Sequence, residues 1–399
     1  MTTTQFKKSI SIGYVLFLTL SILLLNACKK DNNSNEGDYH FENNLISGND
    51  CHNFFRTIGG KHFDRLISVG KTDEGGYIFN GYRGPFDDDD YDVTLFVLKT
   101  NCFGETEWIT DYSTGYLDFG DDILQPTLNG YWILDNSPPI PNLPPETFPI
   151  SLKKLNLVGE VVMSLTHDYN PSRNYNQLLE FQNGNKMICG SINSTGTFIM
   201  NTDQNLNEIW KRDFGFDTII NSIAINKNQN VFACGSLKVN NGNDILLLEF
   251  NQQGNIIWTK VLNIETYSSH ANSISLFNNG DILLVGNYNP GNFYNERIFV
   301  LRLDQLGNEI WNNYLEHEIV LQKNINSISE DNQIKVLGFN GTKLVLVTLS
   351  SDNGLFLSEN ILTLEHTNDM KLTSDGGIIL AGIYDTDSSN DGYIFKTNF

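Results

Sequence analysis

The acidic residues of this chain gather in two short segments that could bind a cation. The run FDDDDYD (86–92) holds Asp87, Asp88, Asp89, Asp90 and Asp92, and DTDSSNDG (385–392) holds Asp385, Asp387 and Asp391. Carboxylate oxygens are the ligands that a hard cation such as Ca²⁺ prefers, although neither segment has the spacing of an EF-hand loop. Three interpretations fit these residues: a solvated acidic rim, a Ca²⁺ site, or a site for a basic partner.

Other patterns of catalytic residues are missing from the sequence. The seven His are scattered, and none has the H-x-H or H-E-x-x-H spacing of a metal site. No glycine-rich phosphate loop follows an apolar run, and no G-x-S-x-G motif forms a nucleophile elbow. We therefore expect no catalytic residues and no cofactor, apart from the Ca²⁺ alternative above.

Composition indicates strands joined by turns. Aromatic residues make up 12% of the 399 residues, Gly contributes 33, and charged residues reach only 18%. This is the composition of an all-β protein. The net charge of −21 argues against nucleic acid as a partner, because few basic groups could neutralise a phosphate backbone.

The first 28 residues have the pattern of an export signal. Lys7 and Lys8 precede an uncharged apolar run at 9–25, which is typical of a signal peptide and near the lower length limit of a membrane-spanning helix. The following LNAC, Leu25 to Cys28, resembles the lipobox of bacterial lipoproteins. That resemblance implies cleavage after residue 27 and a lipid on Cys28, which then becomes the N-terminus.

The residues after Cys28 suggest a cellular address. Lys29 is not the Asp that can retain such lipoproteins in the inner membrane, so the resemblance implies the outer membrane. The start CKKDNNSNEGD also resembles surface-exported lipoproteins, and orientation toward the periplasm or the exterior stays open. Residues 29–50 are polar, rich in Asn and without periodicity, so we interpret 28–50 as a lipidated Cys and a flexible tether.

A repeat of about 50 residues fills the rest of the chain, 51–399. Each copy has a strand, a polar turn, an apolar strand ending in Gly, a variable segment, a third strand, and a Gly/Asn turn before a last strand with Trp. The Gly positions are Gly81, Gly190, Gly235, Gly286, Gly338 and Gly382, and Asp135 stands in a seventh, degenerate copy. Four short strands per copy and seven copies predict a seven-bladed β-propeller.

The ends of the repeat predict how the ring closes. The last copy stops after its third strand, YIFKTNF, and HNFFRTIGG at 52–60 precedes the first copy. We expect this N-terminal strand to complete the last blade, with Phe55 in the place of the Trp. Closure of this kind removes an exposed strand edge.

The four outer-strand Trp residues, Trp108, Trp210, Trp258 and Trp311, are expected to pack between blades. The Gly or Asn before each would supply the positive φ of the turn. The pattern of LDQLGNEIW resembles the tryptophan-docking repeats of quinoprotein-like propellers, a superfamily that includes quinone-dependent dehydrogenases and a scaffold of outer-membrane protein assembly. The resemblance implies the architecture more than any activity.

Two further residue types recur with the repeat. Asn begins the innermost strand at Asn176, Asn221, Asn272, Asn326 and Asn368, either to bond the neighbouring blade or to form a polar ligand site at the channel mouth. Cys189 and Cys234 occupy equivalent positions and are expected to be reduced core residues. Cys51 and Cys102 lie near the starts of outer strands, and their pairing is left open.

The predicted fold places all irregular segments on one face. The acidic segments, the Pro-rich 135–149 and NPGNFYNE (289–296) would share it, and the short turns would form the other. We therefore expect a monomeric, lipid-anchored binding or scaffolding module of the cell envelope, with a protein or glycan partner on the irregular face. A propeller enzyme of quinoprotein or glycan-processing type is the alternative.

Overall fold

The computed structural model describes most of the repeat region of the chain. The described residues are 51, 53–59, 63–84, 93–112, 119–127, 130–136, 150–167, 173–192, 196–239, 242–264, 268–289, 296–315, 326–328, 333–339, 343–364, 366–385 and 390–398. Within them the chain is all β, with seven antiparallel four-stranded sheets. Each sheet is one blade.

The first six blades follow the chain in order. Blade 1 is β2 Phe63–Lys71, β3 Tyr77–Gly84, β4 Thr94–Thr100 and β5 Thr106–Tyr112. Blade 2 is β6 Phe119–Thr127, β7 Gly130–Asn136, β8 Ile150–Leu155 and β9 Val161–His167. Blade 3 is β10 Arg173–Glu180, β11 Lys186–Ile192, β12 Gly196–Thr202 and β13 Glu208–Phe214.

Blade 4 is β14 Thr218–Ile225, β15 Val231–Val239, β16 Gly242–Phe250 and β17 Ile256–Leu262. Blade 5 is β18 Ser269–Leu276, β19 Ile282–Tyr288, β20 Arg297–Leu303 and β21 Glu309–Tyr314. Blade 6 is β22 Asn326–Ile328, β23 Gln333–Phe339, β24 Leu344–Ser350 and β25 Phe356–Leu362. Blade 7 combines β26 Thr367–Leu372, β27 Ile378–Asp385 and β28 Asn390–Thr397 with β1 Phe54–Ile58.

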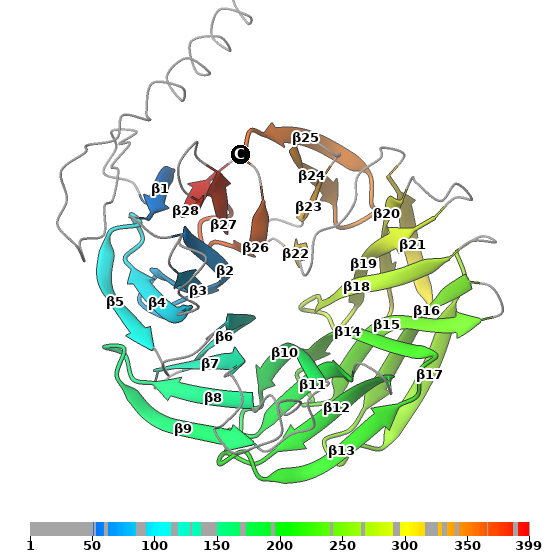
Figure 1. The fold of residues 1–399 in the computed structure, drawn as a ribbon. Coiled ribbons are helices and arrows are strands. Elements are labelled where there is room, and N and C mark those ends of the chain that lie inside the picture. The colour runs from blue at the N-terminus through cyan, green and yellow to red at the C-terminus, as the bar shows by residue number, and fades with distance from the viewer. Residues whose placement is uncertain are drawn as a thin grey trace, which may run out of the picture.

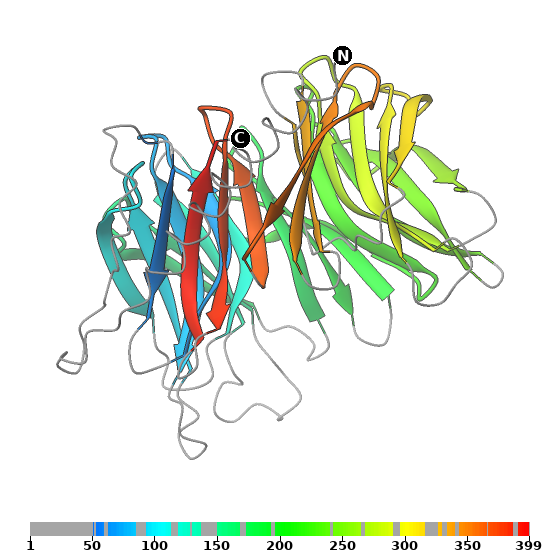
Figure 2. The ribbon, with the colours of Figure 1, turned by 90° about the horizontal axis from the view of Figure 1, so that it is seen from above.

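The seven blades stand in a ring, with the first strand of each blade innermost (Figure 1). The blue β1 lies beside the red β28, so the two ends of the repeat region meet in one sheet. Seen from the side, the strands run between two opposite faces of the ring (Figure 2). The predicted seven-bladed propeller is confirmed, including the degenerate copy that contains Asp135.

Ring closure by the N-terminal strand is also confirmed. All five residues of β1 pair with β28, from Phe54 opposite Lys396 to Ile58 opposite Gly392. Just before this strand, Cys51 forms a disulfide with Cys102 in blade 1, with the two Cα atoms 5.3 Å apart. The pairing that the sequence left open therefore fastens the closing strand to the next blade.

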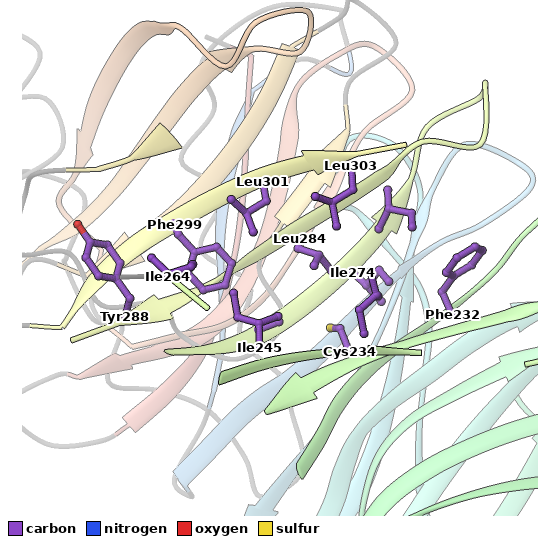
Figure 3. Close-up of a cluster of buried hydrophobic side chains, with 13 residues drawn as sticks. Phe232, Cys234, Ile245, Ile264, Ile274, Leu284, Tyr288, Phe299, Leu301 and Leu303 are labelled. Carbon is purple, nitrogen blue, oxygen red and sulfur yellow. The ribbon is translucent and has the colours of Figure 1, made fainter. Parts of the chain in front are cut away.

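The core is divided among the seven blade junctions. The described buried apolar residues form seven clusters, and each spans two neighbouring blades. Figure 3 shows the junction of blades 4 and 5, where Cys234 and Ile245 face Ile274 and Leu284. Successive side chains of a strand point to opposite faces of the sheet, and each blade packs between two neighbouring blades. A strand of such a blade is therefore apolar on both faces. This explains continuous runs such as ILLVG in β19, whose residues are all buried.

The turns between third and fourth strands share one hydrogen-bonded design. In blade 5, Asp304 N–H donates to the Asn308 carbonyl (2.8 Å), and the Asp304 carboxylate accepts the N–H groups of Leu306 and Asn308 (2.9 and 2.8 Å). The fourth turn residue, Gly307, has φ +74°. The same Asn/Asp pattern recurs in blades 1 to 4, so local chemistry forms the turn.

Each outer-strand Trp packs on the turn of the next blade. The Trp210 indole N–H donates to the Gln252 carbonyl at 2.7 Å, and a Cβ on Gly254 would lie 2.7 Å from the indole ring. Trp108 and Trp311 donate in the same way to Leu157 and Ser351, at 3.0 and 2.9 Å. The predicted packing role of these residues is confirmed, and the Gly serves both the turn and the ring contact.

Blade 3 departs from the predicted Gly or Asn at this turn. Leu206 occupies the position, with φ +62°. In the preceding blade the Trp position is taken by Met163, which packs in the same cluster as Leu206. The smaller Met leaves room that Leu206 fills, since it is buried at 6% exposure. The expectation of Gly or Asn before every Trp was therefore wrong here, and the reason is a compensating exchange across the junction.

The closing strand also differs from the prediction by one residue. Trp108 lies opposite Lys99, and in the last blade the residue opposite the equivalent Lys396 is Phe54. The Phe54 ring packs on Gly104, as the Trp rings pack on the other turns. Phe55 instead faces Tyr384 and the other aromatic residues of blade 7. Phe54, not Phe55, takes the place of the Trp.

Candidate functional site

The direction of the strands defines two different faces of the ring. First-to-second and third-to-fourth strand connections lie on one face, which we call the turn face. Second-to-third strand and blade-to-blade connections lie on the other, which we call the loop face. The acidic segments and the Pro-rich segment connect second to third strands, so the strand ends that bound them lie on the loop face. The predicted division into two faces follows from this topology.

Most of the predicted site residues lie outside the described part of the chain. This holds for the lipidation site Cys28 and for Asp87, Asp88, Asp89, Asp90, Asp92 and Asp387. Asp385 is the last residue of β27. Asp391 belongs to β28, opposite Tyr384, and its carboxyl group lies against Gly59. The part of the acidic segment that is described is thus at the junction of blades 7 and 1.

Asp391 has a carboxylate neighbour at this junction that sequence reasoning missed. Asp64, near the start of β2, is buried at 3% exposure. Burial raises its pKa to about 7, the Arg83 guanidinium opposes the rise, and the Asp391 charge adds to it. Arg83 lies opposite Asp64 in the sheet and forms an ion pair with Asp111. The junction therefore contains a carboxyl group that can change its protonation near neutral pH.

Aromatic rings and a second guanidinium lie at the same end of this sheet but on its opposite face, because Arg65 and Tyr82 alternate with Asp64 and Arg83 along their strands. Arg65 donates from Nη1 to the Tyr82 hydroxyl at 3.1 Å, and its guanidinium lies 5.9 Å from the Phe63 ring centre and 5.8 Å from that of Tyr82. Phe63 and Tyr82 meet edge to face at 6.2 Å. Partly buried aromatic rings beside an Arg guanidinium provide stacking, charge and hydrogen bonds for a polar ligand or a protein side chain.

One signal in the sequence could have pointed to this cluster. The segment FDRLISVG of β2 has two adjacent residues of opposite charge, Asp64 and Arg65, near its start, a pair that the other described first strands lack. The segment YRG at the end of β3 adds Tyr82 and Arg83 to the same end of the same sheet. We refer to Phe63, Asp64, Arg65, Tyr82, Arg83 and Asp391 as the junction cluster.

The described residues contain no group of three or more His, Cys, Asp and Glu side chains that could hold a metal ion. In the junction cluster two carboxyl groups, Asp64 and Asp391, lie near each other, whereas Ca²⁺ takes six to eight oxygen ligands. The side chains present in this part of the chain therefore do not form a calcium site. The acidic segments themselves lie largely outside it.

The Asn residues of the innermost strands connect neighbouring blades. Asn221 Nδ2 donates to the Ala271 carbonyl at 2.8 Å, and Asn368 Nδ2 donates to the Leu66 carbonyl at 2.7 Å. Both Asn residues occupy the bulge of their strand, where one residue is left out of the pairing. For these two positions the interpretation as blade-to-blade hydrogen bonds is confirmed.

The prediction that Asn326 belongs to this set was wrong. In the pairing of blade 6, Asn326 lies opposite Val336, which places it two residues beyond the bulge position. In blades 3, 4, 5 and 7 the bulge residue lies the same number of residues before the repeat Gly of the second strand, as Asn221 lies before Gly235. Counted back from Gly338, that interval ends at Asn324, outside the described residues. The constant spacing was a signal that the sequence already contained.

The cysteines at equivalent positions are buried and unpaired. Cys189 and Cys234 are both fully buried free thiols, as predicted. Burial raises the pKa of the Cys189 thiol to about 12 and that of Cys234 further in the same direction. A buried neutral thiol is a poor nucleophile, so these residues contribute packing and no catalytic group.

Among the described residues there is no helix with the length and apolar character needed to cross a membrane. No protein-family model matches the chain, and no curated protein matches it. Solved structures do resemble it, and the resemblance is one of architecture.

A structure of streptogramin B lyase matches with a TM-score of 0.55 and 10% identity, covering 86% of this chain and 97% of that one. The Dos1 propeller matches with a TM-score of 0.50 and 11% identity, covering 85% and 95%. At such identities the likeness shows the fold alone. The chain has the β-propeller fold, which is shared by proteins of different functions.

Proposed function

We propose that this protein is a lipid-anchored binding or scaffolding module of the outer membrane that takes a protein or glycan partner on its loop face. The anchor is supported by the sequence LNAC directly after an apolar run, with Lys7 and Lys8 before it. The residue after Cys28 is Lys29, which favours the outer membrane. The finer relationship, to quinoprotein-like propellers, is supported by the Trp packing described above.

The observation that carries the binding proposal is the contrast between the two faces. On the turn face the polar side chains are used within the turns, as the Asp304 carboxylate is. On the loop face, the junction cluster has two carboxyl groups and the Arg83 guanidinium on one side of the blade 1 sheet. The Arg65 guanidinium and two aromatic rings lie on its other side, at strand ends beside the acidic segments. Such mixed chemistry beside variable connections on a rigid repeat is typical of a binding surface.

An enzyme of glycan-processing type is the second candidate, and one observation favours it. The pKa of Asp64 near 7 is suited to a general acid, and Asp391 would be the second carboxylate. However, Asp64 is only 3% exposed, so its carboxyl group is not presented to a substrate at the surface. The module is therefore the better-supported function.

The anchor is tested by replacing Cys28. We expect Cys28→Ala to abolish labelling by a fatty-acid analogue and to leave the protein uncleaved or released in soluble form. Membrane attachment with normal mobility in a denaturing gel would contradict the lipoprotein proposal. The matched control is Cys189→Ala, which removes a buried thiol and should leave both labelling and processing unchanged.

Binding is tested with glycan arrays and envelope-protein binding assays on the mature chain. Arg65→Ala removes a guanidinium and Tyr82→Ala removes a ring of the junction cluster. Each should weaken binding at least about fivefold, since each removes a contact worth more than about 1 kcal/mol. Replacing Asp87 to Asp90 with Asn should weaken the binding of a cation or of a basic partner. Lys227→Ala, an exposed change on the turn face, is the control. Loss of binding in the control variant alone would place the partner on the turn face and contradict the proposal.

A further inference from the structure

The exposed apolar side chains of this protein are concentrated on one rim of the ring. Seventeen large apolar side chains are exposed in the described residues. All but Phe216, Ile219, Val261 and Ile361 lie in the turn between the third and fourth strands or in the first two residues of the outer strand. That leaves thirteen at the turn-face edge of blades 1 to 6, which we call the apolar rim.

Members of the apolar rim project strongly into solvent. Leu306, Val158 and Leu355 are 64%, 63% and 63% exposed at the tips of their turns. On the adjoining outer strands, Ile257 and Leu357 are each 50% exposed. Single exposed apolar residues are ordinary, but thirteen that recur at one edge of successive blades indicate a contact surface.

The turns themselves do not require apolar residues at these positions. Leu306 is the third residue of its turn, and the same place in blade 4 is Gln253, whose N–H is bonded in the same way. The shared requirements are the Asn or Asp at the first position and the positive φ at the fourth. The apolar side chains therefore serve something outside the ring.

The path of the chain indicates what lies nearest to this rim. Cys51 is joined to Cys102, the second residue of the blade 1 turn, and β1 begins at Phe54 on the turn face. The chain between Cys28 and Cys51 therefore reaches the body at the apolar rim. Its 22 residues, 29–50, can span no more than about 80 Å when fully extended and about 25 Å on average as a random coil. A lipid on Cys28 would hold this rim close to a membrane surface.

We propose that the apolar rim rests on the lipid surface, so that the turn face lies against the membrane and the loop face points away from it. This inference builds on the proposed lipid anchor, which raises the local concentration of lipid beside the rim. Half-exposed Ile, Leu and Val side chains on a ring of turn tips can enter the headgroup region, which is how interfacial proteins bind. The loop face is then free for its partner.

The charges of the turn face indicate which lipid surface fits. Hydrogen bonds from Asn207 lower the pKa of Asp203, and backbone and side-chain bonds from Asn308 lower that of Asp304, so both stay ionised at neutral pH. Glu160 adds a further carboxylate to the same rim. The rim should therefore prefer a zwitterionic surface, and anionic lipid should weaken its contact at low salt.

Environment-sensitive probes on the two faces test the orientation. Leu306→Cys places a label on the apolar rim, and Phe216→Cys places one on the loop face, where Phe216 is 74% exposed. The native cysteines are buried, disulfide-bonded or lipidated, so the new thiol reacts selectively. With the mature chain in phosphatidylcholine vesicles, we expect the Leu306→Cys label to shift to the blue and to be quenched by spin-labelled lipid. The Phe216→Cys label should remain unchanged.

A second arm separates this inference from the lipid anchor. A Cys28→Ala chain is held by an N-terminal polyhistidine tag on vesicles that contain nickel-chelating lipid, and the same two labels are measured. Contact of the rim in this arm supports the inference whether or not Cys28 is lipidated in the cell. Equal signals from both labels, or a stronger signal from the Phe216→Cys label, would overturn it. So would a blue shift without vesicles that grows with protein concentration, because the rim would then contact a second copy.

A triple variant gives the expected size of the effect. Val158→Ser, Leu306→Ser and Leu355→Ser together remove three side chains that would each bury about half of their apolar surface. The ratio of docked to undocked protein should fall roughly a hundredfold. Thermal unfolding should be nearly unchanged, because these side chains are exposed in the folded body. Unchanged quenching of the Leu306→Cys label after the other two substitutions would contradict the proposal.

Discussion

The closing strand allows a sharp test, because it contains two adjacent Phe residues with different surroundings. Phe54 is 5% exposed, packs on Gly104 and belongs to the core between blades 7 and 1. Truncating a fully buried Phe costs about 3–5 kcal/mol, so we expect Phe54→Ala to cost about 4 kcal/mol. Phe55 is only partly buried, with its nearest ring centre at 5.8 Å, and Phe55→Ala should cost about half as much.

Urea and thermal unfolding, followed by tryptophan fluorescence, would measure the difference. For a body of this size, 4 kcal/mol lowers the melting temperature by about 5 °C. Phe54→Trp restores the residue type found at this position in blades 1, 3, 4 and 5 and should be tolerated, whereas Phe55→Trp should not. The measurements are made with the Cys51–Cys102 disulfide intact and then reduced, since the bond holds the strand nearby. A larger loss for Phe55→Ala than for Phe54→Ala would refute the register of the closing strand.

Three further changes probe the disulfide, the turns and the buried carboxyl group. Cys51→Ser removes the disulfide and should lower the free energy of unfolding by about 4 kcal/mol by the chain-entropy estimate, with equal stability of wild type and variant arguing against the bond. Gly254→Ala meets both a φ of +79° and the Trp210 ring at 2.7 Å, so it should cost about 2–4 kcal/mol, while Gly242→Ala, with no atom nearer than 3.7 Å, should cost little. Asp64 has a folded pKa of about 7 against 3.8 for the free group, so its contribution favours folding at low pH and is lost as the pH rises toward 7. Between pH 5 and 8 the wild type should lose up to about 3 kcal/mol that Asp64→Asn retains, and parallel pH profiles of the two proteins would contradict this.

Several features of the fold could be predicted from local sequence because their causes are local. Apolar runs such as ILLVG indicated strands buried on both faces, and a polar turn after each third strand indicated where the chain reverses. The repeat interval then indicated one blade per copy. An unfinished last copy and an unmatched first strand left one closed arrangement, which β1 and β28 adopt.

The errors came from details of register that the repeat pattern left loose. Phe55 was placed one residue away from the true equivalent of the Trp, because the repeat pattern does not fix the register in which β1 pairs with β28. Asn326 was chosen over Asn324 by its resemblance to the NSI segments, although pairing follows the distance to the Gly. In both cases backbone hydrogen bonds, and not similarity of residues, decide which side chains meet.

By itself, the sequence determined the number of blades, the strand that closes the ring and the residues that pack between blades, and it is the sole basis for the proposed export signal with Cys28. These follow from short-range patterns of polarity, turns and repeat length. Only the tertiary structure joined Asp64 to Asp391, paired Cys51 with Cys102 and gathered the exposed apolar residues on the rim where the chain enters. Such contacts link residues from different blades, and their geometry depends on how seven sheets close into one ring, which no local pattern records.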